Sequence, residues 1–172
     1  VPAENYPFCT IDPSVGIVAV PDERLWALSK FSKSKKTIPA VVEFVDIAGL
    51  VAGASKGEGL GNQFLAHIRE TDAILQVVRI FEDDKIIHVH GRIDPIHDIS
   101  VVNLELILAD FETATKRLQN ISKEIKRGDK EAIKEEELLK KIDQALEAGQ
   151  MASSLDITDD EKFLIKSLNL LT

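Results

Sequence analysis

The spacing of the hydrophobic residues changes near Pro95, and this change restricts the fold more than any other feature of the 172-residue sequence. Before Pro95 the apolar residues form short runs broken by Gly and Pro, a pattern typical of an α/β domain. After Pro95 they recur at alternating steps of three and four, which is the seam of a coiled coil. The seam residues are Leu104, Ile107, Phe111, Ala114, Leu118, Ile121 and Ile125. We therefore expect an α/β layer followed by a long helical element.

The first part of the chain predicts a strand followed by a short helix. Residues 16–20 form an apolar run that Pro21 ends. Asp22 has the side chain and the position of a helix N-cap. The helix it begins is expected to turn its apolar side, with Leu25, Trp26 and Leu28, toward a core. The basic loop that follows, 30–36, is typical of a solvated turn.

Two further apolar runs, 40–45 and 73–81, predict strands buried on both faces. Between them, 60–71 has helical spacing, with Phe64, Leu65 and Ile68 facing inward. Strand, helix and strand in this order form a βαβ unit. That unit predicts a parallel sheet with a right-handed crossover.

The second half of the chain predicts an antiparallel pair of helices. The first, 100–127, would be about 42 Å long at 1.5 Å per residue, too long for a small α/β core. Gly128 and Asp129 then provide a helix terminator and a new N-cap. The second helix, 130–148, continues the seam with Leu139, Ile142 and Leu146. A last helix begins at the capping-box pair Thr158 and Glu161, and the final residues 169–172 read as if cut off.

Composition narrows the classes of partner and compartment. The net charge of −8 argues against a general nucleic-acid groove, although a local basic patch remains open, and no DNA partner is expected. No apolar run reaches the roughly 18–20 residues of a membrane span, so no membrane partner is expected. Val1–Glu4 has no feature of a secretory signal. The single cysteine, Cys9, cannot form an internal disulfide, which favours the cytoplasm.

The residues most suggestive of chemistry follow the second predicted strand. Asp46 ends this strand and Gly49 lies three positions later. In P-loop nucleotidases an Asp at this place binds Mg²⁺ directly or through water, and the Gly lets its backbone N–H approach the terminal phosphate. Five of the nine glycines lie between 49 and 61. Such a segment fits either a loop that phosphate and metal order or a disordered surface loop.

Upstream of the first strand, Thr10 offers a second possible ligand. Its hydroxyl could complete a Mg²⁺ shell and sense the terminal phosphate. Without further information, a threonine in an ordinary loop is the favoured interpretation.

Longer stretches carry a family resemblance. NYPFCTIDP, at 5–13, resembles the switch I sequence of Obg-type nucleotidases. FVDIAGLVAGASKGEGLGNQFL at 44–65, IRETDAI at 68–74, and the FEDD, HVHG and DPIHDI runs within 81–99 resemble the YchF subfamily of Obg-like P-loop ATPases. The likeness extends essentially from end to end. It implies an α/β P-loop nucleotidase of the Ras-like G-domain class. The partial nucleotide-binding domain would occupy 1–99, and an inserted helical hairpin with the return to the domain would occupy 100–172.

The resemblance also implies roles for individual residues. Thr10 and Asp46 would hold Mg²⁺, and Asp46 and Gly49 would bind the nucleotide. Leu50 stands where Ras-like enzymes have their water-orienting Gln, and its side chain cannot hydrogen-bond to water. The implied activity is Mg²⁺-dependent ATP hydrolysis by the whole protein, with a ribosomal partner. An Obg-class GTPase, or a non-catalytic interaction module that works through the hairpin, remain the alternatives.

Two departures from the family pattern matter. The chain has no G-x-x-x-x-G-K-[ST] loop, so we expect a fragment without the P-loop and the C-terminal TGS domain, and without catalysis of its own. The family usually has a His four positions after Asp72, where this chain has Gln76. Gln76 is therefore a candidate for positioning the attacking water, since an amide can orient water but cannot take a proton near neutral pH. A structural role for Gln76 is the alternative.

Two other groups of residues are weaker candidates. His88, His90 and His97 lie within ten residues and could suggest a metal site, but the matching family stretch is not one. Basic residues gather toward the hairpin tip, where a solvated coiled-coil face is the default and a ribosomal RNA or protein contact is the alternative. They are Lys116, Arg117, Lys123, Lys126, Arg127 and Lys130.

Overall fold

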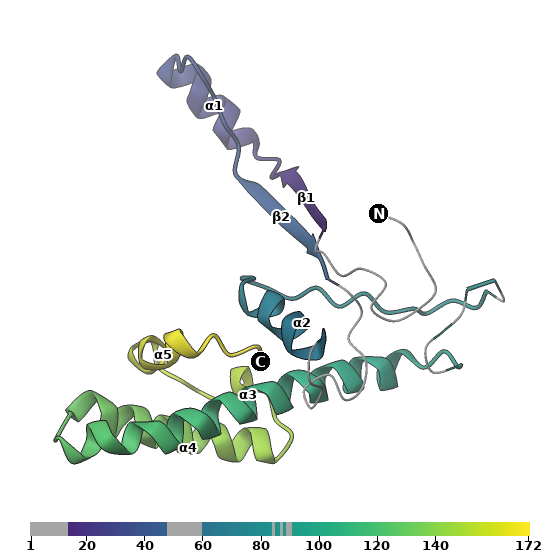
Figure 1. Cartoon of the computed structure of the whole chain (residues 1–172). Helices are drawn as coiled ribbons and strands as arrows, with labels where there is room; N and C mark the ends of the chain where they lie inside the picture. The colour runs from purple at the N-terminus through teal and green to yellow at the C-terminus, as the bar shows by residue number, and fades with distance from the viewer. Residues whose placement is uncertain (1–13, 48–59, 84, 87, 89–90) are drawn as a thin grey trace. The chain divides into compact units, whose positions relative to one another are not determined.

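The computed structural model describes residues 14–47, 60–83, 85–86, 88 and 91–172, without the side chains of 60–64. The chain divides into two compact units. The described part of the first unit is 14–47, and that of the second begins at residue 60 (Figure 1).

The described part of the first unit, 14–47, contains a two-stranded sheet and one helix. Strand β1 (Ser14–Ala19) pairs antiparallel with β2 (Val41–Asp46), with Ser14 opposite Asp46. Helix α1 (Glu23–Ser32) lies between them in the chain, and the Asp22 side chain caps it by accepting from the backbone N–H of Arg24 at 3.0 Å. The predicted first two strands, the stop at Pro21 and the N-cap are confirmed.

The predicted burial of this unit is wrong. Helix α1 buries none of its residues, and Trp26 is 58% exposed. Most apolar side chains of both strands are exposed as well. A strand is buried on both faces only when a layer covers each face. Within residues 14–47, one helix and one strand pair supply no such layers.

The predicted third strand and its parallel sheet are also not formed. Residues 73–80 run without regular secondary structure, and Val77 is 92% exposed. A strand requires a neighbouring backbone to pair with, and in the described part of the chain β1 pairs only with β2. The preceding helix α2 (Leu60–Arg69) is confirmed, with Leu65 and Ile68 buried as expected.

The helical hairpin is formed by α3 (Pro95–Lys126) and α4 (Lys130–Glu147). Helix α3 begins five residues earlier than predicted, because Asp94 accepts from the backbone N–H of His97 at 3.1 Å and Pro95 fits the first turn. Gly128, at φ +82°, ends the first helix. Asp129 caps the second by accepting from the N–H groups of Glu131 and Ala132.

The predicted seam forms the core of the hairpin. Six of its seven residues on α3 are buried in this core or packed against it, together with Leu139, Ile142 and Leu146 of α4. Leu104 is 51% exposed instead. Helix α3 has 32 residues and α4 has 18, so α4 ends before it could cover Leu104. None of the described helices is long and apolar enough to cross a membrane.

The chain after the hairpin returns along it. It contains the short helices η2 (Ala152–Ser154), α5 (Asp159–Ile165) and η3 (Lys166–Leu168). The capping box of Thr158 and Glu161 is confirmed. The backbone N–H groups of Leu171 and Thr172, at the end of this return, donate to Asp110 in the middle of α3.

Candidate nucleotide-switch site

Of the predicted magnesium and phosphate ligands, the described residues include one, Asp46. It is the last residue of β2, where its side chain is exposed and accepts no hydrogen bond from any described residue. A solvated carboxylate of this kind suits a hard cation such as Mg²⁺, which binds oxygen ligands and keeps several waters. Thr10, Gly49 and Leu50 lie outside the described residues, as does Cys9.

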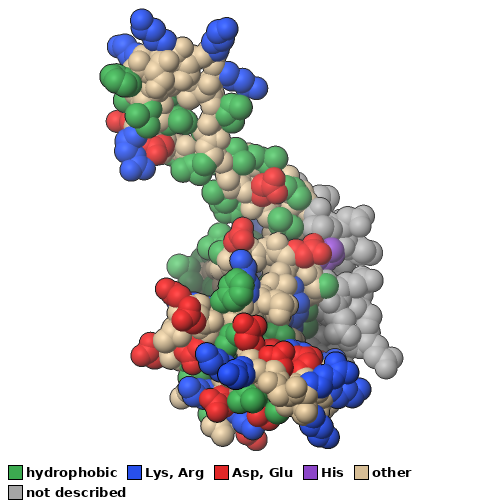
Figure 2. All heavy atoms as spheres, turned by 90° about the vertical axis from the view of Figure 1, so that its left-hand side faces the viewer, with side chains coloured by type: hydrophobic (Ala, Val, Ile, Leu, Met, Phe, Trp, Pro, Cys, Tyr) green, Lys and Arg blue, Asp and Glu red, His purple; other side chains and the backbone are tan. Residues whose placement is uncertain are grey.

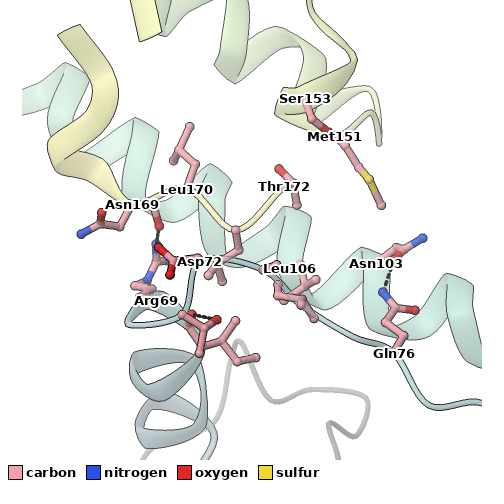
Figure 3. A pocket seen from close by; sticks show the side chains of 15 residues that line it. Arg69, Asp72, Gln76, Asn103, Leu106, Met151, Ser153, Asn169, Leu170 and Thr172 are labelled. Atoms are coloured by element: carbon pink, nitrogen blue, oxygen red, sulfur yellow. Dashed lines mark hydrogen bonds between the residues drawn. The ribbon is translucent and has the colours of Figure 1, made fainter. Parts of the chain in front are cut away.

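Helix α2 follows the glycine-rich segment and ends in a strongly bound arginine. The Arg69 guanidinium donates to the carbonyl of Asn169 at 2.9 Å, to the carbonyl of Ala109 at 3.3 Å, and to Thr113 Oγ1 at 3.0 Å. Figure 3 shows the bond to Asn169 at one side of a cavity. Arg69 thereby joins the end of α2 to the middle of α3 and to the last residues of the chain.

Asp110 completes this junction from within α3. Its side chain is fully buried and lies 3.7 Å from Arg69 Nη1. Its two oxygens accept from the backbone N–H groups of Leu171 and Thr172 and from Thr172 Oγ1, at 2.8–2.9 Å. A buried carboxylate needs this number of partners, because an unpaired buried charge is strongly destabilising.

The Gln76 side chain is hydrogen-bonded to a side chain of α3. Its Nε2 donates to Asn103 Oδ1 of α3 at 2.8 Å (Figure 3). Both residues line a cavity of about 360 Å³, together with Arg69, Asp72 and the terminal Thr172. The Gln76 side chain is half-buried, but its neighbours are exposed, so the prediction that it lies in an otherwise buried strand is wrong. One amide proton is committed to Asn103, and the Oε1 oxygen can still accept from a water.

The segment before α3 is organised by an arginine and a histidine. Arg79 donates to the carbonyls of Phe81, Asp83 and Ile86, and its guanidinium lies 5.1 Å from the centre of the Phe81 ring. His88 Nε2 lies 3.0 Å from Asp98 Oδ2 in the first turn of α3. Over the described positions, which exclude His90, no three His, Cys, Asp or Glu side chains are grouped as they would be to hold a metal ion.

The hairpin carries a half-buried ion triad. Arg117 of α3 donates to Glu135 of α4 at 2.6 and 2.7 Å and to Glu124 at 2.8 and 3.1 Å. Hydrogen bonds to Glu135, and secondarily to Glu124, raise the pKa of the Arg117 guanidinium. The bond from Arg117 lowers the pKa of Glu124. Arg117 therefore connects the two helices and is not available as a surface cation.

Sequence reasoning missed Arg69 and Asp110, although Asp110 carried a signal. It lies three residues after Ile107 and four before Ala114, so it occupies the apolar face of α3. A carboxylate on such a face requires buried partners. Arg69 gave no comparable signal, because its partners lie 40 to 100 residues away in the chain.

Comparisons with known proteins place these features in a family context. The family model described as 50S ribosome-binding GTPase matches residues 1–109. The chain is 57% identical to the ribosome-binding ATPase YchF of Bacillus subtilis over 168 residues, which are 98% of this chain and 46% of that protein. It is 54% identical to the protein of the same name from Haemophilus influenzae, over all of this chain and 47% of that protein.

A solved structure of a YchF protein is also similar to this chain. The chain is similar to the structure of the Schizosaccharomyces pombe YchF GTPase, with a TM-score of 0.70 and 44% identity. The match covers 97% of this chain and 46% of that one. The chain thus spans about half the length of the relatives that it matches.

Proposed function

Because the chain belongs to the Obg-type family of 50S ribosome-binding P-loop GTPases, and within it to the YchF subfamily, we propose that the whole protein containing it is a Mg²⁺-dependent ATPase that switches conformation with its nucleotide and associates with the ribosome. The observation that carries the proposal is the 57% identity to a ribosome-binding ATPase over 98% of the chain. The division into a partial nucleotide domain at 1–99 and a helical insertion at 100–172 is part of this proposal.

Whether the protein prefers ATP or GTP needs a direct test, because the names of the related proteins refer to different nucleotides. The two curated relatives are called ATPases, while the family description and the solved structure say GTPase. The experiment is a calorimetric titration of the whole protein with ATP and with GTP in the presence of Mg²⁺. Tighter binding of ATP is expected. Tighter binding of GTP would refute the ATPase assignment, and binding of neither would favour a non-catalytic module.

Asp46 is the described residue proposed to serve the metal, with Thr10 as the second ligand. Mg²⁺ in such a site offsets the negative charge of the phosphates during transfer. Asp46 meets the chemical requirement, since it is an exposed carboxylate that no described residue hydrogen-bonds. Gly49 would bring a backbone N–H to the terminal phosphate. Leu50 would occupy the position of the water-orienting Gln of Ras-like enzymes, where its apolar side chain forms no hydrogen bond to water. Replacing Asp46 by Asn should weaken the dependence of ATP binding on Mg²⁺ concentration. Unchanged dependence would remove Asp46 from the metal site.

Gln76 is proposed as the residue that positions the attacking water. Its Oε1, which accepts no hydrogen bond from a residue that the structure describes, supports this role, whereas the bond from its Nε2 to Asn103 supports a purely structural one. A water-positioning role predicts slower ATP turnover in Gln76→Ala, whereas a purely structural role predicts turnover at the parent rate.

Residues 1–172 alone should bind nucleotide very weakly and not hydrolyse it. The backbone N–H groups and Lys of the P-loop supply much of the phosphate binding in such enzymes. Calorimetry of the isolated chain would contradict this proposal if ATP bound with a millimolar or smaller Kd.

A further inference from the structure

Gln76 is attached to helix α3 by a contact between two neutral amides. Its Nε2 group donates to Asn103 Oδ1 at 2.8 Å, and both side chains are half-buried and line the same cavity (Figure 3). Among the residues that the structure describes, neither side chain makes any other hydrogen bond. Each amide is therefore the partner of the other.

This contact differs in kind from the polar contacts on the surface of the hairpin. Figure 2 shows Lys and Arg side chains interspersed with Asp and Glu side chains at the hairpin end of the molecule. Some of these charges form exposed ion pairs, such as Lys116 with Glu112, which salt weakens. A hydrogen bond between two uncharged amides depends on the distance and direction of its atoms, so it can hold one side chain at a defined place.

The backbone around Gln76 does not by itself hold the side chain in one position. Residues 73–80 have no regular secondary structure, and the neighbours Leu75 and Val77 are exposed. A Gln side chain is among those that lose the most rotamer freedom when they are fixed. Asn103, in contrast, lies on a helix of 32 residues, three positions before the buried Leu106. Helix α3 therefore provides the fixed point to which Gln76 is attached.

Helix stability does not explain the presence of Asn103. Asn is one of the weaker helix formers, because its short amide competes for backbone hydrogen bonds and is favoured at caps and turns. Asn103 lies in the interior of α3, and its side chain bonds to no backbone group of the described residues. The hydrogen bond to Gln76 is thus what this amide contributes at this position.

From these observations we infer that Asn103 is a positioning residue for ATP hydrolysis by the whole protein, an inference that rests on the proposed role of Gln76. A Gln amide can turn end for end and present either its N–H groups or its oxygen to a water molecule. An acceptor opposite Nε2 removes this choice and leaves Oε1 as the end that accepts from the attacking water. Asn103 acts through Gln76 in this way, and holding the water before the reaction lowers the barrier.

A purely structural role is the competing explanation, in which the contact only fastens 73–80 to α3. The first test measures kcat and KM for Mg²⁺-dependent ATP hydrolysis by the whole protein. Asn103→Leu removes the acceptor and should lower kcat roughly fivefold, the contribution of one neutral hydrogen bond, with KM unchanged. Asn103→Asp keeps an acceptor at the same place and should retain a kcat close to that of the parent.

The matched control is Asn120→Leu. Asn120 is an exposed Asn in the interior of the same helix, and its side chain bonds to no described residue. This variant should hydrolyse ATP at the parent rate. Far-ultraviolet circular dichroism checks that each variant keeps its helices.

The second test determines whether Asn103 acts through Gln76. In the Gln76→Ala background, Asn103→Leu should have no further effect on kcat, because the side chain that Asn103 positions is absent. A structural role predicts that Asn103→Leu changes kcat by the same factor in both backgrounds. That result would overturn the inference.

The third test requires no hydrolysis. Gln76→His introduces an imidazole whose Nε2 is the same number of bonds from Cα as the amide nitrogen of Gln. NMR of its C2–H proton, identified by comparison with the parent, gives its pKa when combined with Asn103→Asp or with Asn103→Leu. A carboxylate within hydrogen-bonding distance favours the charged imidazole, so the pKa should be higher by about one or more with Asn103→Asp. Arg69 and Asp72, the charged residues that line the same cavity, are present in both variants. Equal pKa values would show that the two positions are not in contact and would overturn the inference.

These results also separate the inference from the proposed function. A parent protein without ATP hydrolysis would refute the proposed enzyme, and parent turnover in Gln76→Ala would refute the role of Gln76. Either result would overturn the positioning role of Asn103 as well. Slow turnover in Gln76→Ala together with parent turnover in Asn103→Leu would refute the inference alone. So would an Asn103→Asp variant that keeps its helices but turns over as slowly as Asn103→Leu.

Discussion

Replacing Asp110 by Asn keeps the shape of a fully buried side chain and removes its charge. In the parent, the carboxylate accepts hydrogen bonds from Leu171 and Thr172 and lies 3.7 Å from Arg69. An Asn side chain has one acceptor oxygen, and its NH₂ group would face backbone N–H groups that are themselves donors. The substitution should therefore release the last residues of the chain from α3.

The size of the effect follows from the hydrogen bonds that an Asn side chain cannot accept. Hydrogen bonds to a charged group contribute about 1.5–3 kcal/mol each. Asp110→Asn removes at least one such bond and leaves the Arg69 guanidinium without its nearby negative charge. We therefore expect a decrease of about 3 kcal/mol in the free energy of unfolding. A change of that size lowers Tm by roughly 6–12 °C in a chain of this length.

The assay is guanidinium unfolding of residues 1–172, followed by far-ultraviolet circular dichroism, which reports mainly on α3 and α4. Asp156→Asn is the matched control, because Asp156 is exposed and has no hydrogen-bonding partner in the described part of the chain. It should change stability by less than about 0.5 kcal/mol. A decrease below about 1 kcal/mol for Asp110→Asn would show that the junction does not stabilise this unit.

Three further predictions concern the hairpin and Gln76. Arg117→Ala should destabilise the hairpin by about 2 kcal/mol, because it leaves Glu135 buried without its cation, and adding Glu135→Leu should recover most of the lost stability. A double-mutant cycle measured by urea unfolding tests this, and additive effects of the two substitutions would contradict it. Because its pKa is lowered in the folded protein, the Glu124 carboxylate stabilises the fold fully above pH 4.5, and this stabilisation is lost as the pH falls through the lowered pKa. In acid unfolding titrations below pH 4.5, the parent should therefore lose stability more steeply than Arg117→Ala. Gln76→Ala should slow ATP turnover by the whole protein while leaving ATP affinity unchanged, and Gln76→His should add a rate dependence near pH 6–7; parent turnover in Gln76→Ala would show that the residue is structural.

How well the sequence predicted the structure depends on where the partners of each residue lie. The hairpin was predictable because both helices, their seam and the turn at Gly128 are contiguous in the chain. The third strand was predicted incorrectly because a strand needs a paired backbone, and residues 73–80 find none in the part of the chain described. Of the candidate site, Asp46 was predicted at the end of its strand, and Gln76 was singled out from the sequence without its hydrogen-bonding partner being identified. Asn103, 27 residues away, could not have been named from spacing alone.

The junction of Arg69 and Asp110 gives α3 the mechanics of a lever. One end of the rigid arm is held by the helix that follows the glycine-rich segment, and the other end is the hairpin tip. With the pivot at Asp110 and an arm of roughly 24 Å, a rotation of about 10° would displace the tip by about 4 Å. Close packing of α3 against α4 transmits such a rotation with little loss, because packed interiors are nearly incompressible. A small change in the position of α2 would therefore move the hairpin tip by several ångströms, enough to change which atoms of a bound partner it contacts.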